Sequence, residues 1–182
     1  MPLNPSTVPK SAPKAPELVP VFFVNLKLQD PYPVLENKSY AHSVTLVNIV
    51  DGDISTVPNK LKLELDANSL VGIDHITADT KVGASKLDCY VYGKTPSGAG
   101  LHIHYFGLIK GNEAIGKILG GGKSIETDFA EDYITSNPVI SFDGEVEEKY
   151  LWAKKENLIG KGRFVRDEAG TLYVQYYVYV LE

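Results

Sequence analysis

Short runs of β-branched and aromatic residues, separated by turn-forming residues, make up most of the chain after residue 17. Such runs are typical of paired strands. The turn signals between them include Asp51-Gly52-Asp53, Thr95-Pro96-Ser97-Gly98 and Asp167-Glu168-Ala169-Gly170. The clearest runs cover residues 21–28, 43–50, 61–65, 86–92, 100–109, 158–165 and 171–181. No stretch has a convincing amphipathic helical pattern, so we expect less than about a fifth of the residues to be helical, against the usual third.

The alternation within these runs predicts which side chains face a core, because successive side chains of a strand point to opposite faces. The last run separates a predicted core set from a second set rich in tyrosine: Leu172, Val174, Tyr176, Val178 and Val180 against Tyr173, Gln175, Tyr177, Tyr179 and Leu181. A meander of such strands leaves exposed edges unless it closes on itself. We therefore predict an all-β fold, an antiparallel, closed or nearly closed β-barrel.

Two runs carry most of the residues that are both aromatic and polar. Residues 100–109 set the side chains of Leu101, Ile103 and Tyr105 against those of His102, His104 and Phe106. Residues 86–92 set Leu87, Cys89 and Val91 against Asp88, Tyr90 and Tyr92. Neither face is strongly charged. Small barrels more often turn the apolar side inward, and we expect the face with Tyr105 to pack and the face with the histidines to supply chemistry.

The first residues of the chain differ from the rest, with prolines at positions 2, 5, 9, 13, 16 and 20. Prolines at this density favour extended backbone and withhold amide donors. We predict that residues 1–16 form a Pro-rich extended or disordered arm and that residues 17–182 form a single β-barrel domain. The arm has no apolar core of a signal peptide, and no stretch reaches the roughly 18 apolar residues that cross a bilayer. We expect a cytoplasmic protein that does not enter a membrane.

Charge and cysteine content narrow the partners further. The chain has 18 Lys and Arg against 23 Asp and Glu, a net charge of -5, and no basic block. These numbers argue against binding to nucleic acid. The lone Cys89 cannot form an internal disulfide and lies in an apolar alternation, so a buried, inert thiol is expected. The sequence leaves homo-oligomer formation open.

Histidine and tyrosine are the residues that could perform chemistry. His102 and His104 share one face of a predicted strand, about 7 Å apart, where imidazoles act as general acids or bases. They could also hold a metal with a third ligand from His42, Asp74 or His75, but no ligand set has a recognised spacing, so we predict no metal and no cofactor. The candidate catalytic residues are His102, His104 and Tyr90, and the candidate substrate-binding residues are His75, Tyr92, Tyr105 and Trp152.

One further segment, residues 116–124, has the glycines, lysine and serine of a phosphate-binding loop. Lys117 occupies the position at which the motif requires its first glycine, and Gly116 comes one position too early. We interpret the segment as a glycine-rich turn.

Several short motifs together resemble the family called domain of unknown function 3237. They are Gly72-Ile73-Asp74-His75 and residues 86–95, 96–107, 133–138, 150–152 and 157–163, with Phe142 and the closing Tyr-Val strand. The resemblance covers residues 17–182 and implies a lipocalin-like antiparallel barrel. Some fungal members serve as small isomerases or cyclases of natural-product pathways, so the resemblance favours an enzyme.

These observations lead to one functional hypothesis with two alternatives. We expect a cofactor-independent isomerase, cyclase or lyase that applies acid–base chemistry to a hydrophobic aromatic or enone-like small molecule. A non-catalytic small-molecule carrier would use the same pocket. A structural or partner-binding module would have a filled barrel and use the Pro-rich arm.

Overall fold

The computed structural model describes residue 11 and residues 13–37 and 42–182 of the chain. Ten strands and two short helices cover most of these residues. The strands are β1 (Leu18–Leu28), β2 (Tyr32–Asn37), β3 (His42–Thr56), β4 (Asn68–Asp79), β5 (Ala84–Lys94), β6 (Gly100–Lys110), β7 (Ile125–Glu126), β8 (Ile134–Phe142), β9 (Leu158–Arg166) and β10 (Leu172–Leu181). The helices are α1 (Glu113–Leu119) and the 3₁₀ helix η2 (Glu148–Lys154).

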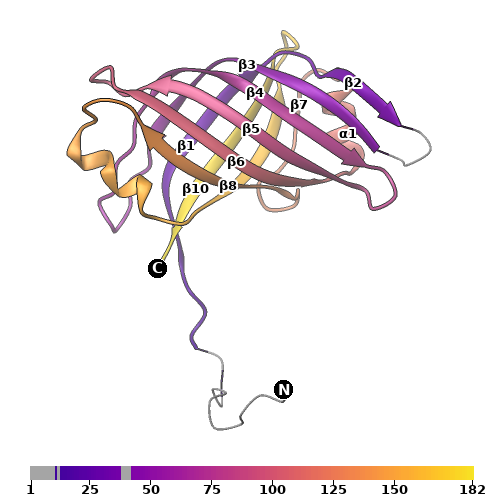
Figure 1. Cartoon of the computed structure of the whole chain (residues 1–182). Coiled ribbons are helices and arrows are strands. Elements are labelled where there is room, and N and C mark those ends of the chain that lie inside the picture. Colours follow the sequence, from indigo (N-terminus) through magenta and orange to yellow (C-terminus); the bar gives the residue numbers. More distant parts are fainter. Residues whose placement is uncertain (1–10, 12, 38–41) are drawn as a thin grey trace, which may run out of the picture.

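Eight of these strands close into a ring (Figure 1). Their order is β1-β10-β9-β8-β6-β5-β4-β3, and β3 pairs back onto β1. Strand β2 extends the sheet from β3, and β7 pairs with β9. All pairings are antiparallel, which confirms the predicted β-barrel.

Strand β3 closes the ring because it changes partners along its length. Residues 42–49 pair with β4, and residues 49–56 pair with β1. Gly52 lies in the second half, where a Cβ atom would stand 2.6 Å from the carbonyl oxygen of Asn25. Only glycine allows this close approach of two backbones. The turn predicted at residues 51–53 is therefore wrong, because these residues continue a strand.

The alternation predicted for the strands is confirmed. In β10 the buried residues are Leu172, Val174, Tyr176, Val178 and Val180. In β6 the residues Leu101, Ile103 and Tyr105 are buried, whereas His102 and His104 lie on the outer face. The inner faces of the strands thus form one apolar core along the barrel axis.

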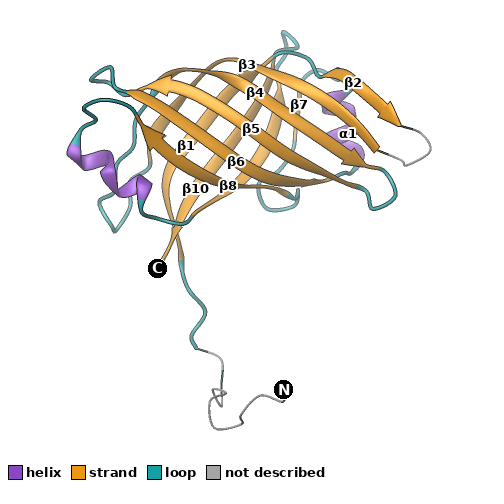
Figure 2. Cartoon of the chain, viewed as in Figure 1, coloured by secondary structure: helices purple, strands orange, loops and turns teal. Residues whose placement is uncertain are grey.

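The two helices lie at opposite ends of the barrel (Figure 2). Helix α1 begins at Asn112, whose side chain accepts a hydrogen bond from the amide of Ile115 at 2.9 Å. Its other end is held by the buried Arg166, whose Nε donates to the carbonyl oxygen of Ile118 at 2.9 Å. Helix η2 buries Tyr150 fully at the other end of the barrel.

Some predicted elements differ from those observed. Each helix has seven residues, so the low helical content is confirmed. Residues 61–65 are not a strand, and the predicted runs do not include β2, β4, β7 and β8. The predicted glycine-rich turn at residues 116–124 begins inside α1. Among the described helices, none has the length and apolar character needed to span a membrane.

The predicted Pro-rich arm falls mostly outside the described residues. Residue 11 and residues 13–16 are described, and all are exposed. Pairing to the barrel begins at Glu17, whose backbone exchanges hydrogen bonds with Glu182.

We predict that deletion of residues 1–16 leaves the barrel intact. The melting temperature should change by less than about 2 °C, because surface changes away from packed groups cost only about 0.5 kcal/mol. A deletion that continues into β1, to residue 22, is the control and should unfold the barrel. A fall of many degrees in the shorter deletion would show that the arm packs against the barrel.

Candidate functional site

A carboxyl group lies inside the apolar barrel. The register pairs Asp74 of β4 with Cys89 of β5, and Cys89 with Tyr105 of β6. The three residues therefore form one row across three neighbouring strands, and all three are buried. Because β4, β5 and β6 alternate in phase, this row points into the barrel.

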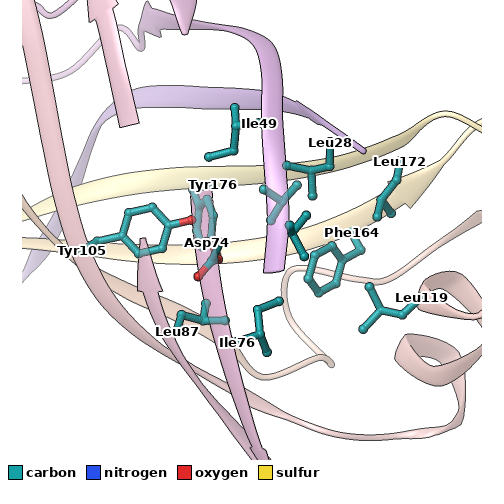
Figure 3. A pocket seen from close by; sticks show the side chains of 12 residues that line it. Leu28, Ile49, Asp74, Ile76, Leu87, Tyr105, Leu119, Phe164, Leu172 and Tyr176 are labelled. Carbon is teal, nitrogen blue, oxygen red and sulfur yellow. The ribbon is translucent and has the colours of Figure 1, made fainter. Parts of the chain in front are cut away.

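Tyr176 of β10 reaches this row from the facing wall. Its ring lies 5.8 Å from that of Tyr105, tilted by 61°. Figure 3 shows Tyr105, Tyr176 and Asp74 close together in the cavity. Gly162 of β9 makes room for Tyr176, because a Cβ at this position would lie 2.5 Å from Cε1 of the tyrosine ring.

The environment of Asp74 favours its protonated form. The residue is 8% exposed, and its Oδ1 has no hydrogen-bond partner in the described part of the chain. Burial raises the pKa of Asp74 to about 7. Hydrogen bonds that the carboxylate accepts from the backbone amide of Asp88 and from the Tyr105 hydroxyl, together with the electrostatic influence of His75, oppose this rise in the pKa but do not cancel it. Asp74 therefore changes charge near neutral pH.

The other polar groups of the row stay neutral. Burial raises the pKa of Tyr105 and of Tyr176 well above the ordinary value of tyrosine. The expected burial of Cys89 is confirmed, and burial also raises the pKa of its thiol, which favours the unreactive protonated form. The two hydroxyls therefore stay protonated at neutral pH and can donate hydrogen bonds.

Tyr105 and Tyr176 divide the interior into two narrow cavities, both of which they line. The cavity on the side of α1 is also lined by Asp74, and its volume is about 10 Å³. The second cavity is purely apolar, with a volume of about 20 Å³. Each has room for about one or two water molecules, so the interior holds a small group without rearrangement and a larger one only if side chains move.

The histidines predicted to be catalytic lie together on the outer face of the barrel. His104 stacks on Tyr90 with ring centroids 4.3 Å apart, and His102 stacks on Tyr92 at 4.9 Å. The Nε2 atom of His104 lies 2.8 Å from Oδ1 of Asp88 in a partly exposed pair. Beside His102 a shallow groove of about 400 Å³ also includes Tyr92, Phe142 and Asp143.

The remaining predicted residues are dispersed. His75 lies on the outer face, where its Nδ1 is 3.3 Å from the carbonyl oxygen of Asp88. Trp152 belongs to η2, where its Nε1 donates to the carbonyl oxygen of Glu64 at 2.7 Å. Tyr105 alone among the seven lines an interior cavity. The apolar side of each strand turns inward and carries the histidines outward, so His102 and Tyr92 share the outer groove and not the barrel interior. The roles expected of these residues stay a prediction.

Two residues of the interior site were not predicted as functional. Tyr176 was assigned to the core, and Asp74 was considered only as a metal ligand and a member of a family motif. The sequence signal for Asp74 was its position in the alternation of the strand, because it lies on the same inward face of β4 as Leu70, Gly72 and Ile76. Within the described residues, no group of three or more His, Cys, Asp or Glu side chains could hold a metal ion.

Comparisons with known proteins place the chain among barrels of unknown activity. A family model described as "Protein of unknown function (DUF3237)" matches residues 16–181. No curated protein matches the sequence. A protein of unknown function from Clostridium acetobutylicum has a TM-score of 0.67 and 15% identity, over 93% of this chain and 99% of its own. A conserved protein of unknown function from Rhodopseudomonas palustris has a TM-score of 0.69 and 15% identity, over 94% of this chain and 100% of its own.

A third similar structure is described as an enzyme from Penicillium herquei. It has a TM-score of 0.58 and 18% identity, over 94% of this chain and 98% of its own. At these identities the three structures support the barrel fold alone. The motif resemblance seen in the sequence is confirmed by the family model.

Replacing Asp74 with Asn should stabilise the protein at high pH. The pKa of Asp74 in the fold, about 7, exceeds the ordinary value of 3.8 for aspartate. Its contribution to stability is therefore present below pH 3.8 and is lost as the pH rises towards and through 7. The wild type loses roughly 4 kcal/mol over this range, and Asp74→Asn does not.

Denaturant unfolding at pH 5 and pH 9 measures the part of this loss that falls between the two pH values, roughly 3 kcal/mol. The groups that also face Asp74 are Tyr105, Tyr176 and Cys89 from inside, and His75 and Asp88 from neighbouring positions. The exposed Asp53→Asn variant is the control and should follow the wild type at both pH values. Equal stabilities of wild type and Asp74→Asn at pH 9 would contradict the raised pKa.

Proposed function

The chain belongs to the DUF3237 family, whose description assigns no activity, and we propose that it is a cofactor-independent enzyme that moves a proton on a hydrophobic aromatic or enone-like small molecule. The observation that carries this proposal is the buried carboxyl of Asp74, with one oxygen unpaired and lining the interior cavity. A buried polar atom without a partner costs stability. Such a cost at a cavity wall is typical of a group that is retained for chemistry.

Asp74 serves as the general base. With a pKa of about 7, the carboxyl is ionised in a large share of molecules at neutral pH. It is also a stronger base than an exposed aspartate, because little water stabilises its charge. A base with a pKa near the working pH contributes about 10² to 10⁴ in rate.

The hydroxyls of Tyr105 and Tyr176 complete the site. Removal of a proton next to a carbonyl places negative charge on the carbonyl oxygen, and neutral donors fixed in a dry site stabilise that charge. Burial raises the pKa of both phenols, so they stay protonated as donors. The two rings brace each other at 5.8 Å, which holds their positions before the ligand arrives.

The reaction balances without any other reagent. The Asp74 carboxylate takes a proton from the carbon next to the carbonyl, and the electron pair of that C–H bond forms the double bond of an enolate. Protonated Asp74, whose proton exchanges with solvent, then delivers a proton to the same or a different carbon, the latter giving an isomerisation, or to a leaving oxygen in an elimination. The carboxylate is regenerated in each case.

Two alternatives use the same interior differently. A carrier would hold the ligand without proton transfer, and a structural module would keep the barrel filled. The narrow cavities are compatible with the filled barrel, and the unpaired carboxyl favours the enzyme. The similar structure from Penicillium herquei is described as an enzyme, which agrees with the proposal.

We predict that the protein exchanges the α-protons of aromatic ketones with solvent. Tetralone and chromanone in heavy water are suitable probes, and nuclear magnetic resonance measures the loss of their α-proton signals. Asp74→Asn should lower the catalysed rate by about 10² or more. Tyr105→Phe and Tyr176→Phe should each lower it by about 10² as one oxyanion donor is lost.

The control for the tyrosine variants is Tyr177→Phe, which changes an outward hydroxyl on the strand that holds Tyr176. A parallel set, His102→Ala, His104→Ala and Tyr90→Phe, tests the residues predicted from the sequence. Loss of exchange in this set, with full exchange in Asp74→Asn, would move the site to the outer face. Binding of the ketones without exchange in the wild type would support the carrier.

The pH dependence of exchange provides a separate prediction. Because Asp74 acts in its ionised form, kcat/KM should rise with pH and level off above about 7. Initial rates between pH 5 and pH 9, corrected for exchange in buffer alone, measure this profile. A rate that falls across the same range would show that the protonated carboxyl is the active form and that Asp74 acts as an acid.

A further inference from the structure

Three rows of inward side chains connect Asp74 to the end of the barrel that α1 covers. The row with Asp74, Cys89 and Tyr105 lies deepest. Two residues farther along each strand the register aligns Ile76, Leu87 and Gly107, and beyond them Ala78, Ser85 and Ile109. At about 3.3 Å per residue, the last row lies about 13 Å from Asp74 along the strands.

The last row opens into a hollow that we call the vestibule. It is lined by β4, β5, β6, the β4–β5 turn and α1, and its volume is about 450 Å³. This size lies within the range of about 300 to 1,000 Å³ that is typical of ligand pockets. The part of its lining used below consists of Ile76, Asp79, Ser85, Ile109, Gly116 and Leu119.

A constriction separates the vestibule from the cavity that contains Asp74. Ile76 and Leu119 line both spaces. Figure 3 shows Leu119 at the end of α1, directed towards Phe164. Leu119 is only partly buried, so its side chain has space to move, whereas the amides of the three glycines that follow it hydrogen-bond back to α1 and hold the backbone in place. A ligand group that displaces Leu119 would enter the cavity beside Asp74.

The lining of the vestibule selects for uncharged ligands. Among the described residues that line it there is no lysine or arginine, and the one charged side chain is that of Asp79. Burial is the largest single influence on the pKa of Asp79 and raises it, but the hydrogen bonds that the carboxylate accepts from His42 and from backbone amides together outweigh burial and lower the pKa, so this carboxylate stays negative at neutral pH. The rest of the lining consists of aliphatic and small polar side chains and backbone.

We infer that the α1 end of the barrel is the entrance and binding site of a neutral, mainly apolar ligand, whose body occupies the vestibule while its reacting end passes Ile76 and Leu119 to reach Asp74. The inference rests on the proposed function for the reaction, and the binding site in the vestibule can be tested without it. It also names a class of substrate, in which a compact carbonyl end extends from a larger apolar body.

Binding of the neutral dye N-phenylnaphthylamine tests this inference through its fluorescence. The wild type should bind the dye, and Gly116→Trp should weaken binding about tenfold or more by filling the vestibule. A Cβ added at Gly116 meets no atom within 4 Å, so the helix accepts the change. The matched control is Lys117→Trp, which adds the same ring next to it at an exposed position outside the lining.

Ser85→Phe provides a second obstruction from a different element, β5, and circular dichroism checks that each variant is folded. The sulfonated dye anilinonaphthalene sulfonate should bind about tenfold more weakly than the neutral dye, and Asp79→Asn should reduce that difference. Asp74→Asn should bind the neutral dye as the wild type does. This result would show that binding in the vestibule does not depend on the proposed general base.

Absence of dye binding by the wild type would overturn the inference. Equal binding by wild type, Gly116→Trp and Ser85→Phe would also overturn it, because the dye would then bind elsewhere. Neither outcome concerns the proton exchange of ketones, which depends on Asp74. Conversely, blocked dye binding together with unchanged ketone exchange in Asp74→Asn would support the vestibule and reject the proposed function.

Discussion

Burial of the Asp74 carboxyl among apolar side chains is the constraint on which the centre of this barrel depends. The group lies with Cys89 and Tyr105 in one row, faces Tyr176 across the interior and keeps one oxygen unpaired. Ionising it costs several kcal/mol, because few solvent dipoles are available to it. The surrounding sequence accommodates this cost locally: Gly162 leaves space for the Tyr176 ring, and the Tyr105 hydroxyl donates towards the carboxyl. A barrel without catalytic chemistry would be more stable with an aliphatic residue at this position.

The two ends of the barrel are closed in different ways, and this difference gives the interior a direction. At one end η2 places Tyr150 and Trp152 against the core, and Trp152 hydrogen-bonds the Glu64 carbonyl oxygen. At the other end α1 has two buried residues, Ile115 and Ile118, and an open hollow beside it. Each helix buries two residues, so the difference lies in the hollow, which shares Ile76 and Leu119 with the cavity that contains Asp74. We therefore expect access to Asp74 from the α1 end.

The sequence predicted the barrel because most strands alternate strictly, as in residues 172–180, where every second side chain is buried. It missed β4, in which Gly72 and Asp74 occupy inward positions and break the apolar period. It missed β8 because Asn137-Pro138 has the composition of a turn. Residues 61–65 alternate like a strand, but Asn59 holds them in a loop through hydrogen bonds to Leu63. The site depends on register across three strands and on Tyr176 from the facing wall, and a single sequence does not specify those pairings.

The same strands carry a second set of polar side chains on their outer face. Exposure to solvent determines which of the two sets, the inner or the outer one, has strongly shifted pKa values. The backbone of Asp88 hydrogen-bonds the inner carboxyl of Asp74, and the side chain of Asp88 pairs with His104 on the outer face. That outer pair is partly exposed, so water screens its charges. For Asp74 burial is the largest influence, larger than the charges of His75 and Asp88. Its basicity therefore depends on how dry the cavity is. Opening the α1 end to water would lower the pKa of Asp74, whereas an apolar ligand in the constriction keeps the carboxyl dry, so that binding and reactivity rise together.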